Sequence, residues 1–196
     1  MSNSFVLASN NQKKAAELRS LLPGLNLLSL EDIGFHQSIP EPFDSFEENA
    51  WTKAETVRRF CSLPVIADDS GLCVEVLNGA PGVKSARYAG EPSDDRRNYE
   101  KLLIELDGEE NRRAYFTSVI CLAGWKDAPV YFSGNCYGQI AKEASGNSGF
   151  GYDPVFIPDG YTEPLAALGS EIKSNISHRA TALQKLKEFL EIEARS

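Results

Sequence analysis

Short apolar runs alternate along this chain with segments whose apolar residues recur every three or four positions. The apolar runs predict strands over residues 4–9, 26–30, 65–67, 72–77, 113–125, 130–138 and 155–157. The helical spacing predicts helices over residues 12–22, 45–60 and 93–106, and a last helix that begins after Ser177. The chain has no internal repeat and no linker-like segment, and its 196 residues suit one large domain or one domain with two lobes.

The predicted strand at residues 65–67 leads directly into two adjacent carboxylates, Asp68 and Asp69, followed by Ser70 and Gly71. Two acids beside a buried strand are costly unless cations or hydrogen bonds compensate them. One interpretation is a divalent-metal site in which one carboxylate orients or deprotonates a water molecule. The other is a polar turn at the end of the strand, and the motif taken alone is more typical of the turn.

Two further polar motifs coincide with predicted helices. Ser9, Asn11 and Lys14 lie where the first strand leads into the first helix, where unpaired helix N–H groups can bind an anion. This is not a Walker-type loop, and helix capping would equally explain it. Asn49 and Lys53 lie four residues apart and share one face of the second helix, which is also the pattern of a solvated stripe.

The C-terminal half holds a glycine-rich loop, residues 145–154, that contains Phe150. An aromatic ring on such a loop can stack on a nucleobase, although buried rings also anchor ordinary turns. Ser177 is a plausible N-cap, which places His178 and Arg179 in the first turn of the last helix. The helix dipole disfavours cations there, so an anionic or electron-rich ligand would explain them better.

Charge and cysteine usage narrow the function classes. A formal net charge of -8 argues against binding a nucleic-acid polymer but permits a small anionic ligand. No apolar run is long enough for a membrane helix, and the N-terminus has no secretory signal pattern. The four cysteines form no Cys-x-x-Cys pair, so we expect reduced thiols in a cytoplasmic protein.

Taken together, the motifs resemble the inosine triphosphate pyrophosphatase family, also called XTP/dITP diphosphatases, in its bacterial form. The resemblance spans nearly the whole chain and keeps the order of six motifs: Ser9-x-Asn11-x-x-Lys14-x-x-Glu17, Phe46-x-Glu48-Asn49-Ala50-x-x-Lys53-Ala54, Ala67-Asp68-Asp69-Ser70-Gly71-Leu72, Gly79-Ala80-Pro81-Gly82-x-x-Ser85-Ala86-Arg87-Tyr88, Gly149-Phe150-Gly151-Tyr152-Asp153-Pro154 and Lys173-x-x-Ile176-Ser177-His178-Arg179.

The resemblance implies an α/β fold with an elongated mixed β-sheet flanked by helices. It implies a single domain over residues 1–196, with two lobes around a central cleft, and a homodimer. The implied reaction is Mg²⁺-dependent hydrolysis of deaminated purine nucleoside triphosphates, ITP, dITP and XTP. Cleavage between the α and β phosphates would give the monophosphate and pyrophosphate and remove these nucleotides from the cellular pools.

The resemblance also implies roles for individual residues. Asp69 would be the catalytic acid that orients or deprotonates the attacking water, and Asp69, Asp68 and Glu41 would surround Mg²⁺, which prefers hard oxygen ligands. The other residues expected to bind substrate fall into a phosphate group, Ser9, Asn10, Asn11, Gln12, Lys13, Lys14, Lys53 and Ser70, and a base group, Phe150, Gly151, Tyr152, Asp153, Lys173, His178 and Arg179.

Within the base group, Phe150 would stack on the purine, and Lys173, His178 and Arg179 would donate hydrogen bonds to its 6-oxo oxygen. Adenine carries an amino donor at that position, so these donors would reject it. Two alternatives stay open: a pyrophosphatase of related fold for modified pyrimidine nucleotides, and a non-catalytic nucleotide sensor. The Phe150 loop and the His178–Arg179 pair speak against the first, and the retained Asp68–Asp69 pair speaks against the second.

Overall fold

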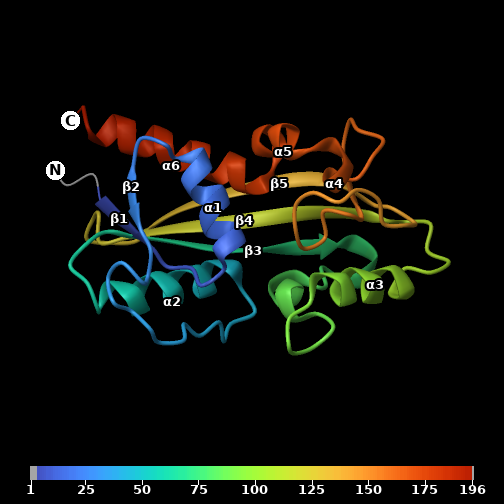
Figure 1. The fold of residues 1–196 in the computed structure, drawn as a ribbon, viewed down its shortest axis with the longest axis horizontal. Helices are drawn as coiled ribbons and strands as arrows, with labels where there is room; N and C mark the ends of the chain where they lie inside the picture. Colours follow the sequence, from blue (N-terminus) through green and yellow to red (C-terminus); the bar gives the residue numbers. More distant parts are fainter. Residues whose placement is uncertain (1–3, 196) are drawn as a thin grey trace. The chain divides into compact units, whose positions relative to one another are not determined.

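The computed structural model describes residues 4–195 and contains strands and helices in alternation (Figure 1). In chain order these are β1 (Ser4–Leu7), α1 (Gln12–Leu21), β2 (Asn26–Leu28), α2 (Phe46–Arg58), β3 (Val65–Val74), the 3₁₀ helices η1 (Glu75–Leu77) and η2 (Gly82–Arg87), α3 (Asp95–Glu105), β4 (Arg113–Ala123), β5 (Val130–Ile140), β6 (Phe156–Pro158), α4 (Leu165–Leu168), α5 (Ser170–Ile176) and α6 (His178–Glu193). None of the helices among the described residues has the length and apolar character needed to cross a membrane.

The strands form one sheet in the order β2-β1-β3-β4-β5-β6. The sheet is mixed, because β1 pairs in parallel with β2 and β3, whereas β5 and β6 are antiparallel. β4 and β5 are neighbours joined by residues 124–129, a connection too short for a parallel crossover. The α/β class with a mixed sheet flanked by helices is therefore confirmed.

The sequence interpretation was wrong about β3, because no turn follows the two acids. β3 runs without interruption from Val65 to Val74, through Asp68 to Gly71, and residues 75–77 form a 3₁₀ helix instead of continuing a strand. A glycine is needed at position 71 because other residues approach its backbone closely, and not because the chain changes direction there. A Cβ atom there would lie 2.2 Å from the Gly82 carbonyl oxygen and 2.6 Å from Ser85 Oγ.

The chain divides into two compact units. Unit 1 comprises the described residues up to Asp69, residues 118–134, and the chain from Arg179 onward; unit 2 comprises residues 70–117 and 135–178. β3, β4 and β5 therefore contribute residues to both units. The boundary falls between Asp69 and Ser70, and again between His178 and Arg179.

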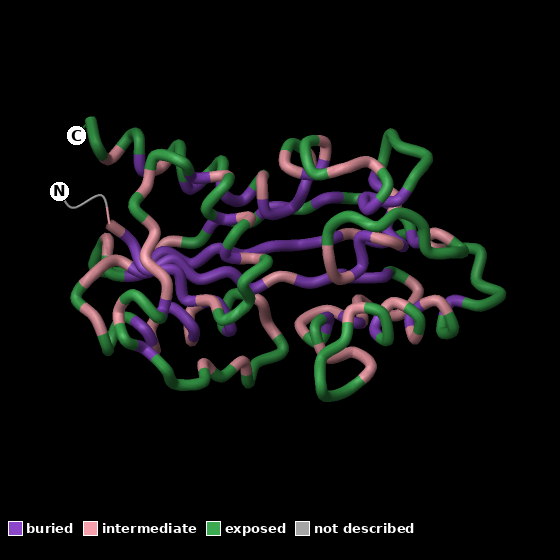
Figure 2. The backbone as a smooth tube through the Cα atoms, in the orientation of Figure 1, coloured by how far each residue is buried: buried purple, intermediate pink, exposed green. Residues whose placement is uncertain are grey.

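Unit 1 is built in layers, with α1 and α6 on one face of its strands and α2 on the other (Figure 1). Alternate residues of β1 enter the two layers: Phe5 and Leu7 pack with α1 and α6, and Val6 and Ala8 pack with α2. In this unit residues 5–7 of β1, 65–69 of β3 and 118–123 of β4 are buried, whereas β2 and residues 130–134 of β5 keep exposed positions (Figure 2). A strand buried on both faces reads as a continuous apolar run, which explains why residues 65–67 carry no polar alternation.

Unit 2 has its own core, in which Leu102 and Leu106 of the α3 segment pack with the β3 residues Leu72 and Val74. Tyr152 and Phe156, from the region around β6, belong to the same core. The predicted helix over residues 93–106 is confirmed, and its N-cap Asp94 accepts a hydrogen bond from the Arg97 N–H. The short helices α4 and α5 were not predicted.

Candidate active site

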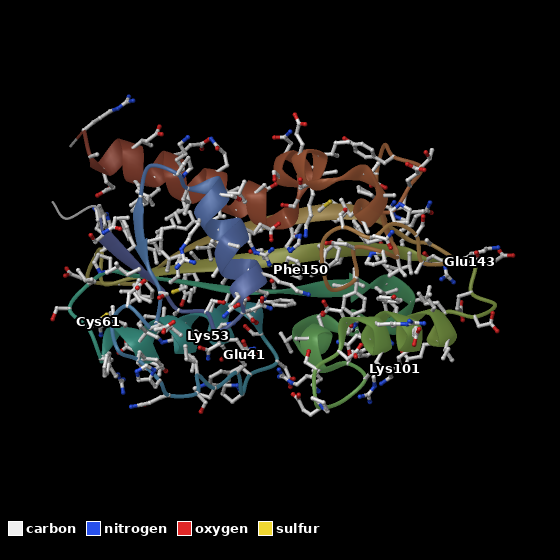
Figure 3. All side chains as sticks on the ribbon, viewed as in Figure 1. Glu41, Lys53, Cys61, Lys101, Glu143 and Phe150 are labelled. Atoms are coloured by element: carbon white, nitrogen blue, oxygen red, sulfur yellow. The ribbon has the colours of Figure 1, made fainter. Side chains whose placement is uncertain are left out.

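Lys53 joins two carboxylates in unit 1. Its Nζ donates to Asp69 Oδ1 at 2.8 Å and to Glu41 Oε1 at 2.7 Å. Lys53 and Asp69 are buried, whereas the Glu41 side chain remains 32% exposed. Figure 3 shows Glu41 and Lys53 beside α2. The ammonium lies between two acids from different segments and offsets the repulsion between them.

Asn49 holds the same cluster from the previous turn of α2. Its Nδ2 lies 3.4 Å from Asp69 Oδ2 and donates to the Phe43 carbonyl oxygen at 2.9 Å, while its Oδ1 accepts from the Phe43 N–H at 3.0 Å. The sequence had allowed a solvated stripe at Asn49 and Lys53, but both side chains are buried and engaged. We call Glu41, Asn49, Lys53 and Asp69 the Lys53 cluster.

Two carboxylates and one ammonium give the Lys53 cluster a formal charge of -1, and the pKa of both buried partners is raised, for different reasons. Burial raises the pKa of Asp69 above its usual value, and the opposing effect of Lys53 offsets this only in part. Burial would lower the pKa of Lys53, but Asp69 and Glu41 more than compensate, so its net shift is upward. Lys53 is therefore charged at neutral pH, and Asp69 is a stronger base than an exposed aspartate.

Asp68 belongs to a separate set of contacts in unit 1. Its Oδ1 accepts from Ser118 Oγ at 2.6 Å, and its Oδ2 accepts from Arg179 Nε and Nη2 at 3.3 and 3.2 Å. Lys14 Nζ lies 3.4 Å from the same Oδ2, and Arg179 Nη1 also donates to Glu17. We call Lys14, Glu17, Asp68, Ser118 and Arg179 the Asp68 network.

Opposite charges balance within the Asp68 network, which contains two cations and two carboxylates. Burial would raise the pKa of Asp68, but Arg179, Lys14 and the Ser118 hydroxyl together hold it far below its usual value. Asp68 was expected beside Glu41 and Asp69 around a metal ion, and its hydrogen bonds in the structure come from Ser118 and Arg179. Arg179 was expected at the purine edge, but its guanidinium lies between Asp68 and Glu17.

The start of α1 supplies the polar groups expected to meet phosphates. Asn11 is the N-cap, and its Oδ1 accepts from the Lys14 N–H at 3.1 Å, while its own N–H donates to Ser9 Oγ at 3.2 Å. The capping interpretation of this motif is therefore confirmed, and anion binding at this helix N-terminus stays a prediction. Three further expected phosphate ligands on this segment are exposed: Asn10, Gln12 and Lys13.

A second group of expected residues forms in unit 2 around Asp153. Its Oδ2 accepts from Lys173 Nζ at 2.7 Å and from the Phe150 N–H at 2.9 Å, and the Lys173 ammonium lies 4.3 Å from the centre of the Phe150 ring. Asp153 and Lys173 are buried, and Phe150, labelled in Figure 3, is half-buried. A Cβ atom at Gly149 would lie 2.1 Å from Asp153 Oδ2, so glycine is required there. We call Phe150, Asp153 and Lys173 the Asp153 group.

The remaining expected residues of unit 2 are placed individually. Tyr152 is buried in the core, and its hydroxyl donates to the Ser85 carbonyl oxygen at 2.9 Å, so its side chain anchors the loop. Gly151 and Ser70 are half-buried. The His178 ring stacks on Phe116, with 4.8 Å between centroids and 12° between planes.

Sequence reasoning did not identify Phe116, Ser118 or Glu17 as members of the site. Ser118 and Phe116 lie on β4, where a polar residue and an aromatic residue both fit an ordinary strand. Glu17 was quoted only as part of a motif and was given no role. Its position one helical turn after Lys14 was the signal that both side chains share one face of α1.

Known proteins are similar to this chain over nearly its whole length. The model of the Ham1 family matches residues 5–189. A dITP/XTP pyrophosphatase of Flavobacterium psychrophilum is 49% identical over 186 residues, which cover 94% of this chain and 97% of that protein. A dITP/XTP pyrophosphatase of Bacillus subtilis is 44% identical over 190 residues, which cover 95% of this chain and 96% of that protein.

Solved structures show the same fold. The Ham1 protein of Staphylococcus aureus superposes with a TM-score of 0.89 at 41% identity, covering 97% of this chain and 99% of the other. A structure described as a nucleoside-triphosphatase or dITP/XTP pyrophosphatase of Mycobacterium abscessus gives a TM-score of 0.77 at 42% identity, covering 93% and 98% of the two chains. Both resemblances extend over nearly the full length of the chain.

Proposed function

The chain belongs to the Ham1 family, and from this premise we propose that it hydrolyses the deaminated purine nucleotides ITP, dITP and XTP between the α and β phosphates. The products are the nucleoside monophosphate and pyrophosphate. The observation that supports this most directly is the Lys53 cluster, in which a buried aspartate of raised pKa shares one ammonium with a second carboxylate. Hydrolysis of a triphosphate needs such charge neutralisation and positioning more than covalent chemistry.

Asp69 is the group that orients and deprotonates the attacking water in this proposal. Its raised pKa brings its basicity closer to neutral pH, where a general base works best. Lys53 stays charged and fixes Asp69 Oδ1, and the Asn49 amide approaches Oδ2. The carboxylate is thereby held in one orientation before the nucleotide arrives.

We propose Mg²⁺ as the cofactor, held by Glu41 and Asp69. Their oxygens are the hard ligands that Mg²⁺ requires, and the Lys53 ammonium already marks a point where the two carboxylates converge. Two carboxylates suffice, because protein-bound Mg²⁺ usually keeps several waters and binds substrate phosphates as well. When bound, Mg²⁺ neutralises charge on the phosphate oxygens.

The phosphates are assigned to the start of α1, where Lys14 supplies a cation and the helix N-terminus supplies the positive end of the helix dipole. The purine is assigned to the Asp153 group and His178 in unit 2. Asp153 holds the Lys173 ammonium over the Phe150 ring, so the stacking aromatic and a hydrogen-bond donor are fixed together. A donor facing the 6-oxo oxygen favours hypoxanthine and xanthine over adenine.

From the resemblance to the family we further propose a homodimer that works in the cytoplasm. Sedimentation of the purified protein over a range of concentrations tests the first part: a mass of twice 21.5 kDa supports it, and a monomer contradicts it.

The two alternative functions have less support. A non-catalytic sensor would not need a buried base of raised pKa, and nothing in unit 2 favours a pyrimidine.

The test is to measure pyrophosphate and orthophosphate release from ITP, dITP, XTP, GTP and ATP, with Mg²⁺ and with a chelator. The proposal predicts Mg²⁺-dependent pyrophosphate from the first three nucleotides and little product from ATP. Orthophosphate as the first product would mean cleavage of the terminal phosphate and would contradict it. Tight binding of ITP without any release would favour the sensor.

A further inference from the structure

The two adjacent acids of β3 face different layers of unit 1. Successive side chains of an extended strand point to opposite faces of the sheet. Asp69 contacts α2 through Asn49 and Lys53, whereas Asp68 contacts Lys14 of α1 and Arg179 of α6. α2 covers one face of the strands, and α1 and α6 cover the other. The two carboxylates therefore have different hydrogen-bond partners, although the charge of Lys53 also acts on Asp68 and that of Lys14 on Asp69.

The surroundings of Asp68 do not suit a metal ligand. Both of its oxygens accept from Ser118 or Arg179, and Lys14 Nζ lies 3.4 Å from the oxygen that Arg179 uses. A divalent ion on that oxygen would lie next to two positive charges in a buried place, where repulsion is weakly screened. Glu41 and Asp69, by contrast, share one cation between two carboxylates.

Burial differs sharply among the three charged partners. The Asp68 side chain is 0% exposed and that of Arg179 is 2% exposed, but that of Lys14 is 19% exposed. Lys14 lies in the first turn of α1, three residues after the N-cap Asn11, whose N–H donates to Ser9 Oγ. Of these three side chains, Lys14 is the one that a ligand can reach. Its ammonium lies 3.4 Å from the buried carboxylate of Asp68.

We propose that Asp68 is a positioning residue that holds Lys14 and Arg179 in place for the triphosphate, and that it is not a metal ligand. This inference rests on the proposed function, because that function assigns the phosphates to Lys14. Glu17 and Ser118 are the other members of this network. Glu17 accepts a hydrogen bond from Arg179 Nη1, and Ser118 donates one to Asp68 Oδ1, which fixes the rotation of that carboxylate.

The experiment compares Asp68→Asn, Lys14→Met and the double variant with the wild type. Three quantities are measured: KM and kcat for dITP, the Mg²⁺ concentration that gives half-maximal rate at saturating dITP, and the Kd of inorganic tripolyphosphate by calorimetry without Mg²⁺. We expect Asp68→Asn to raise KM and the tripolyphosphate Kd by about tenfold, while the Mg²⁺ requirement changes less than about twofold. In the Lys14→Met background the same substitution should have much less effect on KM.

A metal ligand would behave differently. If Asp68 bound Mg²⁺, Asp68→Asn would raise the half-maximal Mg²⁺ concentration by about tenfold or more and leave the metal-free tripolyphosphate Kd unchanged. That result, or full additivity of Asp68→Asn and Lys14→Met, would overturn the inference. Unchanged KM, Kd and Mg²⁺ requirement in a protein of lowered Tm would mean a purely structural role and would overturn it as well.

A milder variant covers the case in which Asp68→Asn does not fold. Ser118→Ala removes only the 2.6 Å hydrogen bond to Asp68 Oδ1 and keeps every charge. We expect it to raise the tripolyphosphate Kd about two- to threefold with an unchanged Mg²⁺ requirement, and an unchanged Kd would contradict the inference. The tripolyphosphate readout also separates the two proposals, because it does not depend on hydrolysis: a wild type that binds tripolyphosphate but cleaves no dITP refutes only the proposed function.

Discussion

At the scale of single residues, the site consists of side chains that are fixed by other side chains. Lys53 is held by Glu41 and Asp69, and Lys173 is held by Asp153. His178 has an aromatic neighbour instead, because its ring lies flat on Phe116. Each functional group thus has a partner that sets its orientation, and the cost of ordering it is met during folding rather than during binding.

The stacked ring of His178 gives a prediction about base selection. His178→Ala removes a donor expected at the 6-oxo oxygen, so the ratio of kcat/KM for dITP over dATP should fall by about 10- to 100-fold. Steady-state kinetics with both nucleotides measures this ratio. Phe116→Leu, which keeps the imidazole but removes the stacking partner, should lower the ratio less than His178→Ala does. An unaltered ratio in His178→Ala would place base selection elsewhere.

At the scale of secondary-structure elements, local signals predicted helices well. Ser45, Asp94 and Asn11 each precede a helix and accept a backbone N–H from its first turn, which a sequence motif can show because all partners lie within three residues. The same local reasoning failed at β3, where a run of polar and glycine residues suggested a turn. Asp68 and Asp69 lie in a strand that sits between β1 and β4 in the sheet, and their side chains contact residues of α1, α2, β4 and α6. These partners are not neighbours of the two acids in the sequence, so local reasoning could not find them.

The candidate site could also be predicted only in part from the sequence. The motif residues Lys53 and Asp69 could be proposed together from the resemblance, and the structure brings them into contact. The division of Asp68 and Asp69 between two faces could not be predicted, because it depends on β3 being one continuous strand. Ser118, more than a hundred positions after Lys14, could join the same network only through the order of the sheet.

The close packing at β3 gives a prediction for stability. Gly71→Ala places a methyl group 2.2 Å from the Gly82 carbonyl oxygen, so the free energy of unfolding should fall by about 1–3 kcal/mol. Urea unfolding followed by circular dichroism measures it. Gly24→Ala is the matched control, because no atom lies within 4 Å of its added Cβ, and it should change stability by less than about 0.5 kcal/mol. Equal stability of the two variants would contradict the packing described for Gly71.

At the scale of the whole molecule, each unit has its own core, and each core buries a cysteine. Burial raises the pKa of Cys121 to about 12 in unit 1 and that of Cys136 to about 11 in unit 2. The described cysteines are all free thiols. In the unfolded chain such thiols ionise near their ordinary value of 9.0, so the two states differ in bound protons at alkaline pH.

This difference predicts how stability depends on pH. A folded pKa above the unfolded value gives a contribution that is complete below pH 9 and is lost as the pH rises toward 11 and 12. The free energy of unfolding should therefore decrease from pH 9 upward, by up to about 1.4 kcal/mol per pH unit for each thiol. Cys136→Ala should flatten this decrease, and Cys61→Ala, at a half-buried position, should not. Identical slopes in the wild type and Cys136→Ala would contradict this account.

The role of Asp69 is tested by the turnover of Asp69→Asn with saturating dITP and Mg²⁺, together with dITP binding by calorimetry. Asparagine keeps an oxygen for Lys53 but cannot take a proton from water, so kcat should fall by about 10²–10⁴-fold while binding stays measurable. Turnover close to that of the wild type, in a protein that still binds dITP, would contradict the assignment of Asp69 as the base that activates water.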